Sequence, residues 1–265
     1  ERISLADKIT LVGRQDKKIR IITNSADIPK DNSNLAYKAA LLLRNSLNIN
    51  QGVDIKIIKR IPVGSGMAGG SSNAATVLLG LNKLWDLKLK KAKLINLARS
   101  LGADVAFFVH ESPFALGKGR GDDIKPLNML KKKKFWHILV VPKIKVSTAL
   151  IYKEWDKQNY RKIFQKRPLT MNRDNVKILC LALKDGSLSL VGKTLFNSLE
   201  MVTFRLHPEI RQVKEKLSRL KLEAVLMSGS GCAVFGLVPS RKEAMSLSRV
   251  LRKNKSWQVF VTRTS

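Results

Sequence analysis

The residues with the clearest chemical potential form a glycine-rich segment, Ile-Pro-Val-Gly-Ser-Gly-Met-Ala-Gly-Gly-Ser-Ser-Asn-Ala, that runs from Ile61 to Ala74. Glycines let the backbone approach a ligand closely, and successive N–H groups at a helix start form an anion-binding concavity. The hydroxyls of Ser71 and Ser72 can donate to a phosphate or ligate magnesium. The segment therefore points to a di- or triphosphate site, although glycine-rich turns without a ligand are equally common. It lacks the Gly-Lys-Ser/Thr ending of a Walker loop.

A second candidate is Asp104, which follows Gly102 at the end of a predicted helix. An apolar run over residues 105–109 comes next and is predicted as a strand. A carboxylate held between them can accept the proton of a substrate hydroxyl or orient that hydroxyl. From the residues alone, a turn or helix-ending aspartate is the favoured interpretation.

The elements that must position these residues alternate between strand and helix patterns. In the first half, alternation or apolar runs predict strands over residues 8–12, 18–23, 53–61 and 114–116. Helices are predicted from residue 32, where Asn32, Ser33 and Asn34 can cap, and over residues 74–85 and 94–101. In the second half, strands are predicted over 135–141, 224–227, 233–238 and 258–262, and helices over 148–156, 172–183, 208–220 and 240–251. Because no βαβ unit repeats, the pattern favours an α+β fold with antiparallel sheet.

Charge is the unusual property of the composition. The chain has 50 Lys and Arg against 20 Asp and Glu, a formal net charge of +30. This excess favours anionic partners such as nucleotides, nucleic acid or a membrane surface. The basic residues are nevertheless spread along the chain, with one dense run at Lys131 to Lys134 that marks a domain boundary, and aromatic residues make up only 6%. A solvated basic surface is favoured over a nucleic-acid-binding surface, in which aromatic residues would lie among the basic ones.

The remaining composition narrows the class of protein. A chain of 265 residues with 44% hydrophobic residues can bury a good core. No apolar run approaches the ~18 residues that span a bilayer, and no signal-peptide pattern opens the chain. The two cysteines, Cys180 and Cys232, have neither zinc-like nor redox spacing and are predicted to be reduced thiols of a cytoplasmic protein. The three histidines are scattered, which argues against a metal site built on them.

Several motifs resemble those of one known family. The pattern Pro-x-x-x-Gly-x-x-x-x-Ser-Ser, which starts at Pro62, is similar to the phosphate-loop signature of the GHMP kinases. Residues 68–78, 81–85, 101–108 and 146–148 resemble the branch of 4-diphosphocytidyl-2-C-methyl-D-erythritol kinases, and residues 227–235 resemble the third family motif. The likeness follows the whole chain in order.

The resemblance implies an α+β fold of two lobes. Residues 1–133 would form the ATP-binding lobe, similar to domain 2 of ribosomal protein S5, and residues 134–265 a ferredoxin-like lobe. The implied reaction transfers a phosphoryl group from ATP, with Mg²⁺, to the 2-hydroxyl of 4-diphosphocytidyl-2-C-methyl-D-erythritol. The alternatives are a GHMP kinase for another small alcohol and an inactive basic relative that binds nucleic acid. The metal ligands are not predicted.

The resemblance also assigns site residues. Asp104 aligns with the catalytic aspartate of the family. The implied phosphate-loop residues are Pro62, Gly64, Gly66, Met67, Ala68, Gly69, Gly70, Ser71 and Ser72. Asn34 lies in a stretch that resembles a segment near the adenine, or it caps its helix. Tyr152 stands where the family places an aromatic that stacks on cytosine, with an ordinary helix tyrosine an equal alternative. Thr148, Gly229 and Gly231 are implied substrate contacts, although a plain tight turn would also explain the two glycines.

The chain departs from the family pattern in three places. The family usually has Gly where Ala68 stands and Asp where Asn73 stands; the alanine costs little unless that position needs a positive φ. The leading hairpin, which carries the family's catalytic lysine, has no counterpart here, and the sequence enters at residues 3–7. An incomplete sequence is the favoured interpretation, because loss of leading strands would expose a sheet edge. Neither Lys8 nor Lys17 lies in the lysine's motif.

Overall fold

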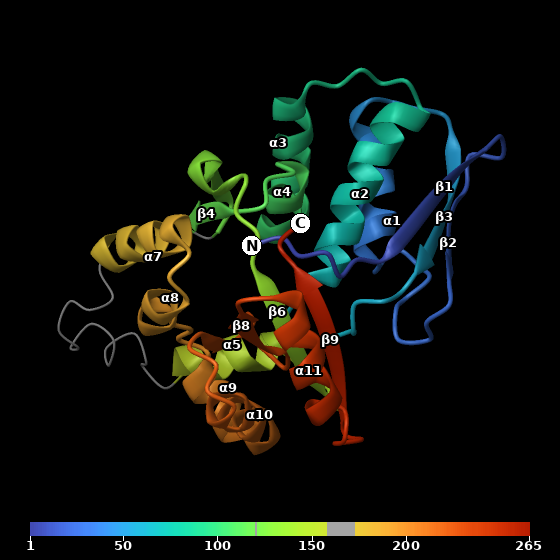
Figure 1. Ribbon diagram of the computed structural model, residues 1–265. Helices are drawn as coiled ribbons and strands as arrows, with labels where there is room; N and C mark the ends of the chain where they lie inside the picture. The colour runs from blue at the N-terminus through green and yellow to red at the C-terminus, as the bar shows by residue number, and fades with distance from the viewer. Residues whose placement is uncertain (120, 158–172) are drawn as a thin grey trace. The chain divides into compact units, whose positions relative to one another are not determined.

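The computed structural model describes residues 1–119, 121–157 and 173–265 (Figure 1). These residues separate into two compact units. The first unit comprises Glu1–Val63 and Ala68–Lys131, and the second comprises Gly64–Met67 and Lys132–Ser265. The glycine-rich segment is therefore divided, with its middle residues in the second unit and its flanks in the first.

The first unit is built on a three-stranded sheet of β1 (Lys8–Arg14), β2 (Ile19–Thr23) and β3 (Gly52–Ile58) in the order β1-β3-β2. Strand β1 runs antiparallel to β3, whereas β2 runs parallel to it. The expectation of antiparallel pairing is therefore wrong for β2 and β3. The physical reason is the helix between them, since a helical crossover returns the chain in the same direction.

Four helices complete this unit: α1 (Leu35–Ser46), α2 (Gly69–Leu84), α3 (Lys91–Leu101) and α4 (Ala103–Val109). They lie on one side of the sheet in Figure 1. Val53, Ile55 and Ile57 alternate along β3 and are at most 1% exposed, so this face of the strand packs into the helical layer. Asp54, Lys56 and Ile58 of the opposite set are less buried, as expected of a sheet covered on one face.

Helix α4 corrects one sequence prediction. Residues 105–109 are helical and not a strand. Val105, Ala106 and Val109 are fully buried, and they recur at the spacing of one helix face that packs against α2 and α3. A short apolar run carries no periodicity that separates a buried strand from a buried helix, so packing decided the outcome here.

The first unit ends with elements that the sequence predicted only in part. A hairpin is formed by β4 (Ala115–Lys118) and β5 (Asp123–Pro126), and the 3₁₀ turn η1 (Asn128–Leu130) follows. Only the first of these strands was predicted. The second carries charged residues at alternate positions and buries little apolar surface, which explains its weak signal.

The second unit contains a four-stranded antiparallel sheet of β6 (Trp136–Pro142), β7 (Val225–Met227), β8 (Val234–Val238) and β9 (Trp257–Arg263). The strands pair in the order β7-β8-β6-β9. Helices connect the first strand to the second and the third to the fourth. This is the split arrangement of a ferredoxin-like fold.

The helices of the second unit are α5 (Thr148–Lys157), α7 (Arg173–Asp185), α8 (Leu188–Thr194), α9 (Glu200–Leu206), α10 (Pro208–Arg219) and α11 (Arg241–Leu251). The helix predicted over residues 208–220 is confirmed as α10, and Ile210, Val213 and Leu217, which recur at helical spacing, are fully buried. Helices α8 and α9 were not predicted, and the predicted start of α7 at residue 172 lies outside the described residues. Among the described residues, no helix has the length and apolar character needed to cross a bilayer.

Candidate functional site

The start of helix α2 has free backbone amides that are suited to bind an anion. Ala68 is the residue before the helix, and no side chain caps the first turn. The amides of Gly69, Gly70 and Ser71 precede the first intrahelical hydrogen bond, which Ser72 N donates to the Ala68 carbonyl at 2.9 Å. Amides in this position point along the helix axis, where the helix dipole favours negative charge.

Ala68 occupies the left-handed region, with φ 51° and ψ 34°. Alanine is therefore unfavourable at this position, because a residue with a Cβ is strained at positive φ. We expect Ala68→Gly to raise the free energy of unfolding by about 0.5–1 kcal/mol. Thermal unfolding checks this, with Ala74→Gly inside the same helix as a control of opposite sign. A lower melting temperature for Ala68→Gly would contradict the strain.

Asn34 acts as the cap of α1. Its Oδ1 accepts a hydrogen bond from Ala36 N at 2.9 Å, and its Nδ2 donates to the Pro29 carbonyl at 2.7 Å. The start of α1 lies beside the start of α2, since Leu35 Cδ1 is 3.6 Å from the position a Cβ would take on Gly70. The structure thus places Asn34 near the α2 start while committing its side chain to the helix cap. Its role toward adenine stays a prediction.

Asp104 lies in the first turn of α4, which packs along α2. Asp104 is exposed, yet desolvation by the surrounding protein raises its pKa above the ordinary value of an aspartate. A carboxylate that is accessible and less acidic than usual is suited to accept a proton. The role of Asp104 in catalysis stays a prediction.

In the second unit, Gly64–Met67 lies against the turn that joins β7 and β8. Ser228 Oγ donates to the Gly66 carbonyl at 3.0 Å, and Ala233 N donates to the Ser65 carbonyl at 3.0 Å. A Cβ on Gly66 would lie 2.3 Å from the Ser228 carbonyl oxygen, so only glycine fits at this contact. The structure therefore joins the middle of the glycine-rich segment to the third family motif.

The β7–β8 turn is held by polar side chains that sequence reasoning missed. Asn197 Nδ2 donates to the carbonyls of Met227, at 2.9 Å, and Gly229, at 2.8 Å. Glu200 Oε1 accepts from Met227 N at 2.9 Å. Asn197 and Glu200 lie around the start of α9. Because this helix was not predicted from the sequence, the roles of the two residues were not predicted either.

The predicted substrate residues gather at the same turn. Thr148 Oγ1 lies 2.9 Å from Ser230 Oγ, a residue between Gly229 and Gly231. Both glycines have positive φ, 55° and 89°. Tyr152 lies on α5, the helix that begins at Thr148, and is exposed.

Next to this turn the second unit contains a cavity of about 470 Å³, within the range of small-molecule sites. Its wall includes four aromatic side chains, from Tyr152, Trp155, Phe196 and Phe235, and polar groups of residues 197, 198, 228 and 229. Phe196 is 45% exposed. Phe196 was not among the predicted site residues.

Among the described residues, no group of three or more His, Cys, Asp or Glu side chains is placed to hold a metal ion. The candidate oxygen ligands at the α2 start are serine hydroxyls. Ser72 Oγ donates to the Gly69 carbonyl at 2.9 Å, so its hydroxyl is engaged within the helix. These groups fit a magnesium ion that arrives with phosphate oxygens, because Mg²⁺ commonly takes only one or two protein ligands.

Comparison with known proteins adds the family context. A profile described as "GHMP kinases N terminal domain" matches residues 34–112, and one described as "GHMP kinases C terminal" matches residues 181–256. A protein of Bacillus velezensis named 4-diphosphocytidyl-2-C-methyl-D-erythritol kinase is 40% identical over 250 residues, which cover 94% of this chain and 82% of that protein. A protein of the same name from Alkaliphilus metalliredigens is 42% identical over 246 residues, or 93% and 80% of the two chains.

Solved structures agree with these matches. A crystal structure of 4-(cytidine 5'-diphospho)-2C-methyl-D-erythritol kinase aligns with a TM-score of 0.75 and 31% identity, covering 99% of this chain and 88% of that one. The homoserine kinase of Cytophaga hutchinsonii aligns with a TM-score of 0.79, covering 98% and 85%, but at 22% identity, and it shows likeness of fold alone.

Proposed function

The chain belongs to the GHMP kinase family, and from this premise we propose that it phosphorylates the 2-hydroxyl of 4-diphosphocytidyl-2-C-methyl-D-erythritol. The observation that carries the proposal is the start of α2, where a strand, a glycine-rich segment and a helix without a side-chain cap combine. This arrangement suits the phosphates of ATP. Relatives that are about 40% identical over most of their length carry the name of this kinase, which supports the substrate.

In this proposal the loop residues Pro62, Gly64, Gly66 and 67–72 surround the ATP phosphates. Mg²⁺ would be held by Ser71 or Ser72 together with phosphate oxygens, and it would neutralise charge that develops during transfer. Asp104 accepts the proton of the attacking hydroxyl or orients it. Its raised pKa supports this role, since a better base receives the proton more readily.

The aromatic cavity of the second unit is our candidate for the acceptor site. A cytosine ring stacks favourably on aromatic side chains, and Tyr152 and Phe196 are the two that are exposed in its wall. Thr148, Gly229 and Gly231 border the same turn and supply polar contacts to the remainder of the acceptor. We place the reaction in the cytoplasm, where the free thiols of Cys180 and Cys232 stay reduced.

Replacing either exposed aromatic should weaken acceptor binding selectively. We expect Phe196→Ala and Tyr152→Ala each to raise KM for the acceptor about tenfold, from a stacking loss of about 1–3 kcal/mol, with KM for ATP unchanged. Steady-state kinetics with each substrate varied checks this. Leu150→Ala is the matched control, because Leu150 is similarly exposed on α5 and does not line the cavity. Unchanged acceptor KM in both aromatic variants would remove the cavity from the site.

A panel of acceptors tests the substrate assignment. ADP formation would be compared for the cytidine-diphosphate-linked alcohol, homoserine and mevalonate, at equal ATP. The proposal requires kcat/KM to be highest for the cytidine-linked acceptor by at least about 100-fold. A higher value for either smaller alcohol would assign the chain to another member of the family.

A further inference from the structure

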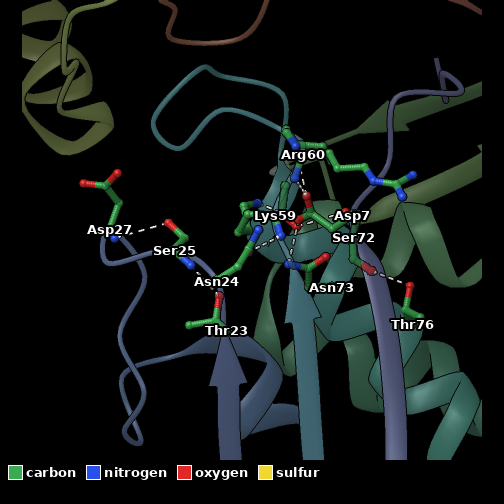
Figure 2. A network of polar contacts seen from close by, with 12 residues as sticks. Asp7, Thr23, Asn24, Ser25, Asp27, Lys59, Arg60, Ser72, Asn73 and Thr76 are labelled. Atoms are coloured by element: carbon green, nitrogen blue, oxygen red, sulfur yellow. Dashed lines mark hydrogen bonds and ion pairs between the residues drawn. The ribbon is translucent and has the colours of Figure 1, made fainter.

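A partly buried polar network lies where β3 leaves the sheet of the first unit (Figure 2). Three consecutive backbone amides donate to side chains there. Lys59 N donates to Asn24 Oδ1 at 2.8 Å, and the amides of Arg60 and Ile61 donate to Asp7 Oδ1 at 2.7 and 2.9 Å. The chain's entry into the glycine-rich segment is thus fixed by side chains from two other parts of the unit.

The second oxygen of the same carboxylate reaches helix α2. Asp7 Oδ2 accepts hydrogen bonds from Lys59 Nζ and from Asn73 Nδ2, the latter at 2.9 Å. The Asp7 side chain is 0% exposed and that of Lys59 is 9% exposed. One carboxylate therefore connects the end of β3 with the first part of α2.

The charges in this network balance each other. A buried carboxylate needs a cation or several donors to offset its desolvation, and Asp7 has both. Because Lys59 is neutralised at short range by Asp7, the pair contributes little net charge to attract a phosphate. Its contribution is geometric.

The Asp7–Lys59 pair acts on the spacing between the two ends of the glycine-rich segment. A Cβ on Gly69 would lie 3.2 Å from Lys59 Nζ and 3.1 Å from Ile61 Cγ2, so the start of α2 packs directly on the β3 exit. Moving either partner of the Asp7–Lys59 pair would change where the first amides of α2 point.

We propose that Asp7 is a positioning residue, which holds the β3 exit and the α2 start at the separation that makes the α2 amides converge on phosphate. The inference rests on the proposed function for its ligand. It assigns a role to Asp7 and to Asn73, for which the sequence alone predicted none.

The protonation state of Asp7 agrees with this role. Burial alone would raise its pKa, but hydrogen bonds from Arg60, Lys59, Ile61 and Asn73 outweigh burial and leave the pKa below its ordinary value. A lowered pKa in the folded state means that the ionised carboxylate stabilises the fold above about pH 4, and that this stabilisation is lost as pH falls further. The network is therefore intact at neutral pH.

The test compares Asp7→Asn with Asp54→Asn. Asp54 also pairs with cations, Arg14 at 2.9 Å and Arg20 at 3.1 Å, but it lies at the opposite end of β3. We expect Asp7→Asn to raise KM for ATP about 10- to 100-fold, with acceptor KM unchanged, whereas Asp54→Asn leaves both near wild type. Equal ATP KM in Asp7→Asn and wild type would overturn the inference.

Hydrogen exchange provides a readout that does not depend on the reaction. In Asp7→Asn the amides of residues 60–72 should exchange faster than in wild type, while the rest of the sheet stays protected. If Asp7→Asn does not fold, Asn73→Ala takes its place, because it removes one hydrogen bond and keeps the charge pair. Asn73→Ala should give a smaller increase in exchange over the same segment. Unchanged exchange in Asn73→Ala and in folded Asp7→Asn would contradict positioning. Absence of phosphoryl transfer by wild type would instead refute the proposed function.

Discussion

Asp104→Asn is expected to lower kcat about 10²- to 10⁴-fold while leaving the dissociation constant of ATP nearly unchanged. The amide keeps the size of the side chain and its exposure in the first turn of α4, but it cannot take a proton from the attacking hydroxyl. Phosphoryl transfer depends mainly on positioning and charge neutralisation, so the loss should appear in the chemical step. Single-turnover kinetics and equilibrium ATP binding measure the two quantities separately.

Asp86→Asn is the control for this variant, because Asp86 is an exposed aspartate of the same unit whose side chain is 79% exposed. It should behave like wild type. The pH profile adds a second check: because desolvation raises the pKa of Asp104, the rate should fall as pH drops through a value above the ordinary pKa of an aspartate. Wild-type turnover in Asp104→Asn would remove this residue from the mechanism.

Gly66→Ala should have the largest effect on stability within the glycine-rich segment. A Cβ there would lie 2.3 Å from the Ser228 carbonyl oxygen and 2.7 Å from that of Gly231, and Gly66 also has φ 74°. Backbone atoms on both sides cannot yield as a side chain would. We expect a loss of about 3 kcal/mol or more, with ATP binding reduced in parallel.

Gly64→Ala separates the cost of a side chain at positive φ from the cost of the close backbone contact. Gly64 has a similar φ of 69°, but the nearest atom to a Cβ at this position would be the Val146 carbonyl oxygen at 3.7 Å, an ordinary contact. Only backbone strain remains, and it should cost about 1–2 kcal/mol. Denaturant unfolding of both variants gives the difference; equal losses would show that the contact with the β7–β8 turn contributes nothing.

The sequence was most informative where local chemistry and periodicity agree. The glycine-rich segment between β3 and α2 was recognised from residue types alone, and the amphipathic stripe of α10 gave both its limits and its buried face. The capping preference of asparagine correctly placed Asn34 at the start of α1, because an Asx cap is a local interaction.

Long-range effects were beyond the sequence. The parallel pairing of β2 with β3 depends on a crossover, and the helical state of residues 105–109 depends on packing against α2 and α3. Asp7 directly precedes the strand predicted over residues 8–12, and nothing local indicated that it would meet Lys59 and Asn73 in a partly buried network. Such partners are far apart in the chain and are brought together only by the fold.

Transfer of a labelled γ-phosphoryl group from ATP to 4-diphosphocytidyl-2-C-methyl-D-erythritol is the most direct test of the account. The wild-type chain would be incubated with both substrates and Mg²⁺, and the product identified by mass and by the position of its new phosphate. One labelled phosphate is expected on the 2-hydroxyl, and Asp104→Asn should abolish this labelling. Label on another hydroxyl, or none on the acceptor, would contradict the proposed reaction.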